Sequence, residues 1–237
     1  MKHKFWNWVR DSDSGERTLI LNGQIAADSW FGDEVTPAIF QNELMQCEGD
    51  ITVWINSPGG DVFAAAQIYN MLMAYGGNVT VRIDGLAASA ASVIAMAGTK
   101  VEMSPVGMLM IHNPATIAIG DTSEMQAAIA MLEEVKESII NAYELKTGLP
   151  REQISNLMDA ESWMNAKKAM ELGFVDSILF INEDDEKESV NVDAMLFSRQ
   201  AVTNSFMNKL KAKKSFKMQD NRVSADLLKK RLDVIIH

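Results

Sequence analysis

The sequence predicts an α/β fold in which buried strands alternate with helices. Two patterns carry this prediction. β-rich apolar runs are separated by segments of helical spacing, and "ITVWI" (51–55) is apolar throughout, as strands buried on both faces are. The length of 237 residues is enough for a domain with one large core and at most a modest appendage. The composition, 47% hydrophobic and 23% charged side chains, is that of an ordinary globular protein.

In chain order, the first elements alternate between strand and helix. The run "TLILNGQI" (18–25) predicts a strand, and residues 33–47 carry apolar side chains at near-helical spacing. The strand at 51–55 leads directly into "NSPGG", after which residues 61–77 predict a helix that glycines end. "NVTVRIDG" (78–85) predicts the next strand. This alternation implies crossover connections between strands.

The second half begins with a helix of small and apolar residues, "ASAASVIAMAG" (88–98), followed by short strands in "VEMS" and "GMLMIHNP". Residues 121–148 then predict a helix of roughly 40 Å, which Thr122 or Ser123 caps and Gly148 ends. One apolar stripe runs along this helix: Met125, Ile129, Leu132, Val135, Ile139 and Ala142. Such a helix either crosses the core or protrudes to meet another subunit.

Charge divides the chain near its C-terminal end. Residues 205–237 hold nine Lys/Arg and three Asp, which gives them a net charge of +6. Because the whole chain has a net charge of −10, residues 1–204 have a net charge of −16. The run "INEDDEKES" (181–189) is acidic and predicts a solvated linker. We therefore expect four parts: an N-terminal segment (1–17), a main domain (18–180), an acidic linker (181–204) and a basic tail (205–237).

Composition also excludes several classes of protein. The net negative charge argues against general nucleic-acid binding. The most apolar stretch, 85–98, is too short and too rich in alanine and serine for a membrane span, and the N-terminus lacks the apolar core of a signal peptide. A single cysteine, Cys47, allows no internal disulfide and fits a reducing compartment. We expect a cytoplasmic protein.

Few histidines are available to act as a catalytic base. Of three histidines, two lie at the chain ends, so an imidazole base would have to be His112, where an apolar strand stops at a proline. Ser89 falls where a strand passes into a helix, so helix amides would favour an oxyanion beside it. Ser92 lies one turn further in and is expected to face helix packing. The simpler alternative is that all these small residues serve only close packing.

The turn "NSPGG" supplies a second requirement of acyl transfer. Its glycines expose bare backbone N–H groups between a strand and a helix, so Gly60 and Ala90 could together donate to an oxyanion. No Lys-Ser/Thr pair follows, so the turn is not a phosphate-binding P-loop. An ordinary strand-to-helix turn would look the same.

Four stretches, taken in order, resemble the Clp protease proteolytic subunit family of serine peptidases: "INSPGGDV" (55–62), "GLAASAAS" (85–92), "MIHNP" (110–114) and "AMELGFVDSIL" (169–179). The similarity covers about residues 18–180. It implies a crotonase-like ββα superhelix with residues 121–148 as a protruding handle helix. It also implies Ser89 as nucleophile, His112 as general base, and Gly60 and Ala90 as oxyanion donors, with no metal or organic cofactor.

The third catalytic residue departs from the family pattern. Gapless alignment back from "GFVDSIL" puts Glu161 where the family carries an aspartate. Asp159 is the alternative, because in an extended segment its side chain would point the same way. Glutamate serves in some hydrolase triads. The gapless register favours Glu161, and a dyad without either acid stays open.

The resemblance also implies a peptide or protein substrate and stacked homo-oligomeric rings, heptameric by analogy. The tryptophan-rich N-terminus does not match the family's axial loop, which argues against an ATP-dependent (AAA+) unfoldase partner. Divergent members with such tails are typical of phages, so capsid proteins are the alternative partners and capsid maturation the alternative role. Two other functions remain: a catalytically inactive ring or scaffold component, and a crotonase-like acyl-CoA enzyme.

Overall fold

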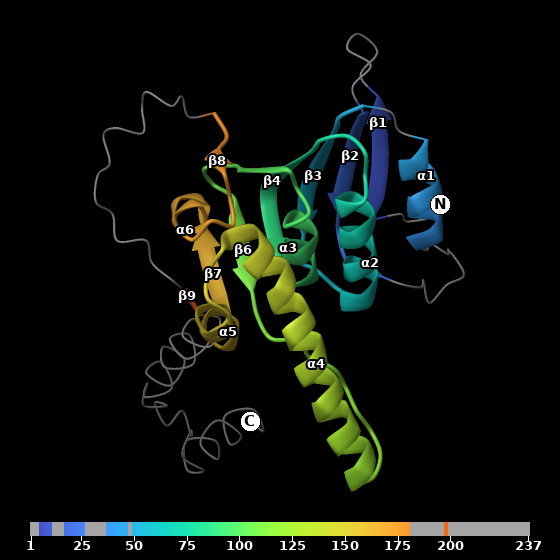
Figure 1. Ribbon diagram of the computed structural model, residues 1–237, viewed down its shortest axis with the longest axis vertical. Helices are drawn as coiled ribbons and strands as arrows, with labels where there is room; N and C mark the ends of the chain where they lie inside the picture. The colour runs from blue at the N-terminus through green and yellow to red at the C-terminus, as the bar shows by residue number, and fades with distance from the viewer. Residues whose placement is uncertain (1–4, 11–16, 27–36, 47–48, 181–196, 199–237) are drawn as a thin grey trace, which may run out of the picture. The chain divides into compact units, whose positions relative to one another are not determined.

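The computed structural model describes residues 5–10, 17–26, 37–46, 49–180 and 197–198. Within these ranges one mixed sheet is flanked by helices (Figure 1). Its strands are β1 (Trp6–Arg10), β2 (Arg17–Asn22), β3 (Ile51–Ser57), β4 (Val79–Ala88), β5 (Lys100–Met103), β6 (Met108–Ile111), β7 (Ser162–Asn165), β8 (Ser177–Ile178) and β9 (Phe197–Ser198). The helices are α1 (Pro37–Met45), α2 (Val62–Met73), α3 (Ala90–Ala95), α4 (Thr122–Thr147), α5 (Arg151–Asp159) and α6 (Ala166–Glu171). The predicted α/β class is confirmed.

The centre of the sheet is parallel. Strands β2, β3 and β4 pair in parallel, and the long strand β4 then splits its partners: its first half pairs with β5 and its second half with β6. The edges are antiparallel, where β1 joins β2 and where β7 joins β6. The second half of β4 and β6 therefore end together, and this shared edge carries the site described below.

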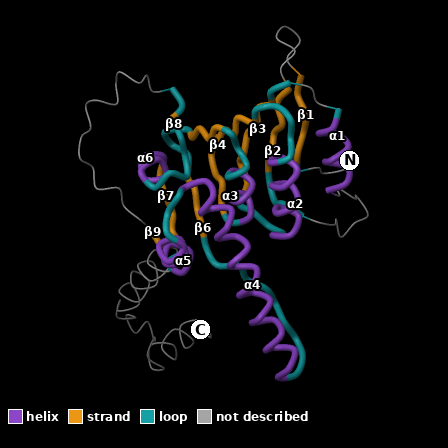
Figure 2. Tube along the Cα trace, in the orientation of Figure 1, coloured by secondary structure: helices purple, strands orange, loops and turns teal. Residues whose placement is uncertain are grey.

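Helices α2 and α3 lie on one face of the central strands, as Figure 2 shows. Small side chains allow α3 to lie close to the sheet, and all six of its residues are buried. Asp61 begins α2, because its carboxylate accepts a hydrogen bond from the amide of Ala64 (2.8 Å). The buried apolar residues of both helices belong to the same hydrophobic core as strands β2 to β6.

Helix α4 is buried only in its C-terminal half. Asp121 and Glu124 form a capping box at its start, and Gly148 ends it in the left-handed conformation. Its buried residues are Ile139, Ile140, Ala142 and Tyr143. The N-terminal half extends beyond the sheet with the preceding loop beside it (Figure 1). The apolar stripe predicted along the whole helix therefore continues onto an exposed section, where Ile129 and Met131 face solvent.

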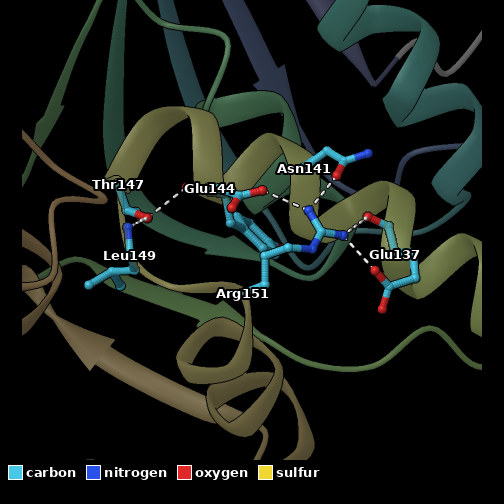
Figure 3. A network of polar contacts seen from close by, with 7 residues as sticks. Glu137, Asn141, Glu144, Thr147, Leu149 and Arg151 are labelled. Atoms are coloured by element: carbon cyan, nitrogen blue, oxygen red, sulfur yellow. Dashed lines mark hydrogen bonds and ion pairs between the residues drawn. The ribbon is translucent and has the colours of Figure 1, made fainter.

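A network of hydrogen bonds and ion pairs connects the C-terminal half of α4 to the start of α5 (Figure 3). The Arg151 guanidinium donates to Asn141 (2.6 Å), Glu144 (2.7 Å) and Glu137 (2.5 Å), which lie along one side of α4. These carboxylates raise the pKa of Arg151 above its ordinary value. Because the groups are largely exposed, the network orients α5 more than it stabilises the fold.

Several predicted boundaries differ from the structure. The sequence predicts that residues 1–17 are a segment outside the main domain. In the structure, Trp6–Arg10 form β1, and Trp6 is buried against Phe40 of α1. The predicted linker over 181–204 contains β9, which pairs with β7. The remainder of that linker and the tail at 205–237 lie outside the described residues. Among the described helices, none has the length and apolarity that a membrane span requires.

Candidate active site

Ser89 occupies a strained turn between β4 and α3. Its φ of 55° lies in the left-handed region, which a residue with a side chain rarely adopts. Two backbone hydrogen bonds hold it there: its amide donates to the carbonyl of Met110 (2.9 Å), and the amide of Ser92 donates to its carbonyl (2.9 Å). Such strain typically costs about 1–3 kcal/mol and is concentrated at functional sites.

His112 follows the last residue of β6 and reaches this turn. Because Ala88 pairs with Met110 in the parallel ladder, both chains continue at the same edge of the sheet. The Nε2 atom of His112 lies 2.6 Å from the Oγ atom of Ser89, within hydrogen-bonding distance. The structure therefore brings together the two residues that the sequence singled out as nucleophile and base.

The Pro58–Gly60 turn lies directly against Ser89. A Cβ atom built on Gly59 would come within 2.6 Å of the Ala88 carbonyl oxygen, 2.8 Å of the Ser89 Cβ and 2.9 Å of the Ala90 nitrogen. Gly59 and Gly60 also have φ angles of 93° and 148°, which favour glycine. The turn thus needs glycine both for its backbone and for its contact with the serine.

Ile25 fixes the position of this turn from the other side. Its amide donates to the carbonyl of Gly59, and its carbonyl accepts from the amide of Asp61, each at 2.9 Å. A side chain on Gly60 would meet the Ile25 oxygen at 2.0 Å. Gly60 and Ala90 line the same pocket as Ser89 and His112.

We expect Gly59→Ala to lower kcat by about 10²-fold or more, because moving the turn away from Ser89 would misplace the amide of Gly60, which the sequence predicts as an oxyanion donor. The positive φ should also lower the free energy of unfolding by about 1 kcal/mol or more. Peptide hydrolysis kinetics and thermal unfolding measure the two effects. Gly76→Ala is the matched control, since a Cβ there meets nothing within 4 Å. Wild-type kcat in Gly59→Ala would show that the contact has no catalytic importance.

The two candidate acids have different surroundings. Asp159 is the last residue of α5, and its Oδ1 accepts hydrogen bonds from Lys136 (2.6 Å) and Asn113 (2.8 Å). The Lys136 ammonium, followed by the Asn113 amide, lowers the pKa of the Asp159 carboxyl below its ordinary value. Asp159 is therefore an ionised group tied to α4 and to the residue after His112.

Glu161 directly precedes β7, the strand that pairs with β6. Strands β6 and β7 pair antiparallel up to Ile111 and Ser162, so His112 and Glu161 are the next residues beyond the paired ends, with Glu161 in a turn outside the strand. The Oε1 atom of Glu161 is buried, and no described residue donates a hydrogen bond to it. The extended segment assumed for 159–161 is wrong, since α5 ends at Asp159 and Glu161 has a φ of 47°.

A pocket of about 360 Å³ opens beside Ser89 and His112. Its walls are largely apolar and come from the start of α2 and from α4: Val62, Phe63, Met131, Leu132, Val135 and Ile139. A groove of about 570 Å³ between α2 and α4 shares much of this wall, including Phe63 and Met131. The site thus adjoins space for an apolar side chain.

The expectation that Ser92 faces inward agrees with the structure, where its side chain is fully buried. Sequence reasoning did not single out its partner, Tyr143, whose hydroxyl lies 2.8 Å from the Ser92 Oγ. The one available signal was a tyrosine directly after Ala142 on the apolar stripe of α4, since a buried tyrosine hydroxyl usually has a polar partner.

A serine on a strained strand-to-helix turn, with an imidazole at its hydroxyl and a glycine turn against it, has the architecture of a serine hydrolase. The Clp protease family model matches residues 5–182 of the chain. The chain is 33% identical over 171 residues to an ATP-dependent Clp protease proteolytic subunit of Porphyromonas gingivalis, covering 69% of this chain and 74% of that protein. It is 36% identical over 166 residues to proteolytic subunit 2 of Thermobifida fusca, covering 69% and 81%.

A third relative, proteolytic subunit 2 of Chlamydia pneumoniae, is 28% identical over 193 residues, which are 76% of this chain and 95% of that protein. The chain belongs to the Clp protease family. It is a serine endopeptidase of the Clp type, and the similarities favour this activity over an inactive scaffold or an acyl-CoA enzyme.

Proposed function

We propose that this chain hydrolyses peptide bonds with Ser89 as nucleophile and His112 as general base. The observation that carries the proposal is the 2.6 Å distance between Ser89 Oγ and His112 Nε2. His112 accepts the hydroxyl proton as Oγ attacks the scissile carbonyl, and then donates it to the leaving amine. Water, activated by the same imidazole, releases the acyl group from Ser89.

The oxyanion of each tetrahedral intermediate is held by the amides of Gly60 and Ala90. Gly60 lies in the turn packed against Ser89, and the Ala90 amide belongs to the peptide that follows Ser89. Preorganised amides are effective here because they are already directed at the position where charge develops. The apolar wall beside the serine supports a preference for a bulky apolar residue next to the scissile bond.

We assign the orienting carboxylate to Glu161. It comes one residue before the pair of Ile111 with Ser162, as His112 comes one residue after it, and its buried Oε1 has spare accepting capacity among the described residues. Asp159 is already engaged by Lys136 and Asn113. A carboxylate beside the imidazole stabilises the cation formed during attack and holds the reactive tautomer.

Glu161→Gln should therefore lower kcat by about 10²- to 10⁴-fold, with the upper figure that of losing the carboxylate from a complete triad. The matched variant Asp159→Asn should cost tenfold or less, because it weakens a half-exposed ion pair with Lys136. Steady-state kinetics on a short peptide substrate compare the two. The reverse order of effects would transfer the role to Asp159, and two small effects would indicate a Ser–His dyad.

Assembly through the exposed half of α4 is part of the proposal. Ile117 and Ile119, in the loop before α4, are 90% and 91% exposed, and Ile129 and Met131 face solvent on the helix itself. Apolar side chains clustered on a protruding element fit a contact with another copy of the chain. By analogy with the family we propose stacked rings of seven subunits, with a peptide or protein substrate and either an ATP-dependent unfoldase or capsid proteins as partner.

The proposal is tested by treating the purified protein with a fluorophosphonate probe and recording native and peptide mass spectra. We expect one adduct per chain, located on Ser89, in an oligomer. An assembled oligomer without adduct would favour the inactive scaffold, and an adduct on another residue would refute the assignment of Ser89. The intact mass also reports whether residues 205–237 are removed.

A further inference from the structure

A buried chain of hydroxyl groups lies beneath the turn that carries Ser89. The Oγ of Ser92 donates a hydrogen bond to the Ser89 carbonyl oxygen (2.5 Å), and the Tyr143 hydroxyl lies 2.8 Å from the same Oγ. Ser92 is 0% exposed and Tyr143 is 1% exposed. Because Tyr143 belongs to α4, these two hydrogen-bonded hydroxyl groups connect α4 to the backbone of Ser89.

The direction of each hydrogen bond follows from the chemistry of its groups. A carbonyl oxygen can only accept, so the single Ser92 hydroxyl proton points at the Ser89 carbonyl. The Tyr143 hydroxyl must then donate to Ser92 Oγ. Burial raises the pKa of the Tyr143 phenol above its ordinary value, which keeps that proton in place. The order is fixed: Tyr143 donates to Ser92, and Ser92 donates to Ser89.

The Ser89 carbonyl and the Ala90 amide belong to one planar peptide group. In a trans peptide the C=O and N–H bonds point in opposite directions, and no peptide bond among the described residues is cis. Hydrogen bonds that hold the Ser89 oxygen toward the core therefore direct the Ala90 N–H away from it. Since Ala90 lines the pocket together with Ser89 and His112, we take the N–H to be directed into that pocket.

We propose that Tyr143 and Ser92 are positioning residues that aim the Ala90 amide at the oxyanion. The inference rests on the proposed roles of Ser89 and Ala90. Tyr143 lines the pocket beside Ser89, but both residues are buried, and the two hydroxyls act through the Ser89 carbonyl. The Ser92 amide already donates to the Ser89 carbonyl, and the Ser92 hydroxyl adds a second hydrogen bond that helps to hold the strained φ of Ser89. Polar atoms in the buried half of α4 thereby contribute to the geometry of the reaction centre.

Two variants test the proposal with little change in packing. Tyr143→Phe keeps the ring and its edge contact with Phe174 (5.6 Å between centroids), and Ser92→Ala removes one oxygen. We expect each to lower kcat about tenfold, as for one lost buried hydrogen bond, with KM unchanged within about twofold. Because the hydroxyls act in series, the double variant should be no slower than the more damaging single variant.

A second measurement separates positioning from general stability. A peptide aldehyde places an oxyanion in the site after Ser89 adds to it, whereas a product peptide does not. Both variants should bind the aldehyde about tenfold more weakly and the product peptide normally. Tyr75→Phe is the control, because it loses a surface hydrogen bond from its hydroxyl to the Gly49 carbonyl (2.8 Å). It should change neither the affinity for the aldehyde nor the affinity for the product peptide.

The outcomes are distinct from those that test the nucleophile itself. Unchanged kcat and aldehyde affinity in an assembled Tyr143→Phe or Ser92→Ala protein would refute the positioning role while Ser89 remains the nucleophile. Losses that multiply in the double variant would refute the serial arrangement. If only one of the two variants assembles, its kcat and its affinity for the aldehyde decide whether the positioning role holds. Activity that survives Ser89→Ala would refute the proposed function and this inference together.

Discussion

Replacing Ser89 with alanine should remove peptide hydrolysis, with kcat falling by about 10⁶-fold, the loss seen when a serine triad loses its nucleophile. The change deletes one atom, Oγ, which lies 2.6 Å from His112 Nε2. Alanine fits the turn, where Ala88 and Ala90 flank it and the backbone bonds to Met110 and Ser92 do not involve the side chain. The oligomer should form as before. Hydrolysis of a fluorogenic peptide and native mass spectrometry measure both results.

Two other serines provide controls for this experiment. Ser92→Ala should still become fully labelled by the fluorophosphonate, at the reduced rate expected from its positioning role. Ser177→Ala should behave as wild type, because Ser177 lies on β8 beside β5, which pairs with the end of β4 remote from Ser89. Activity or labelling that survives in Ser89→Ala would mean that a different hydroxyl performs the chemistry.

The pairing of Ser89 with His112 was predictable because it depends on strand order and on few residues. Both follow apolar strands that end at the same edge of a sheet, and only one histidine lies away from the chain ends. The glycine turn was predictable for a similar reason, since "NSPGG" joins a buried strand to a helix. Its contact with Ser89 was not, because the approach of Gly59 to Ala90 depends on how Ile25 clamps the turn.

Elements that depend on tertiary contacts escaped prediction. Strand β1 reads "WNWVR", with alternating tryptophans beside charged residues, and it is ordered by packing of Trp6 on Phe40 and by pairing with β2. The helix at 121–148 was predicted with one continuous apolar stripe, yet only its C-terminal half is buried within this chain. A stripe shows that a helix face is apolar; it does not show whether the covering surface belongs to the same chain.

The carboxylate was the least predictable part of the site. A gapless register favoured Glu161, and the supporting argument for Asp159 assumed an extended chain that the structure replaces with a helix end and a left-handed residue. Tyr143 was overlooked because an aromatic residue on an apolar stripe resembles core packing. Its hydroxyl becomes informative only once it is placed beside Ser92.

His112→Ala should lose almost as much activity as Ser89→Ala, because a serine hydroxyl without its base is a poor nucleophile. The double variant Ser89→Ala/His112→Ala should then be no slower than either single variant, since the two residues act as one unit. In the single variant His112→Ala, fluorophosphonate labelling of Ser89 should slow in parallel with hydrolysis. Kinetics of the three variants at equal oligomer concentration test this non-additivity.

The control for His112 is His3→Ala, which alters another of the three histidines and should leave kcat unchanged. Wild-type-like hydrolysis in His112→Ala would show that the 2.6 Å contact with Ser89 Oγ has no role in proton transfer. Single losses that multiplied in the double variant would mean that the two side chains contribute separately. Either result would contradict a shared nucleophile–base mechanism, since the proton that leaves Ser89 has to reach His112 before the peptide bond breaks.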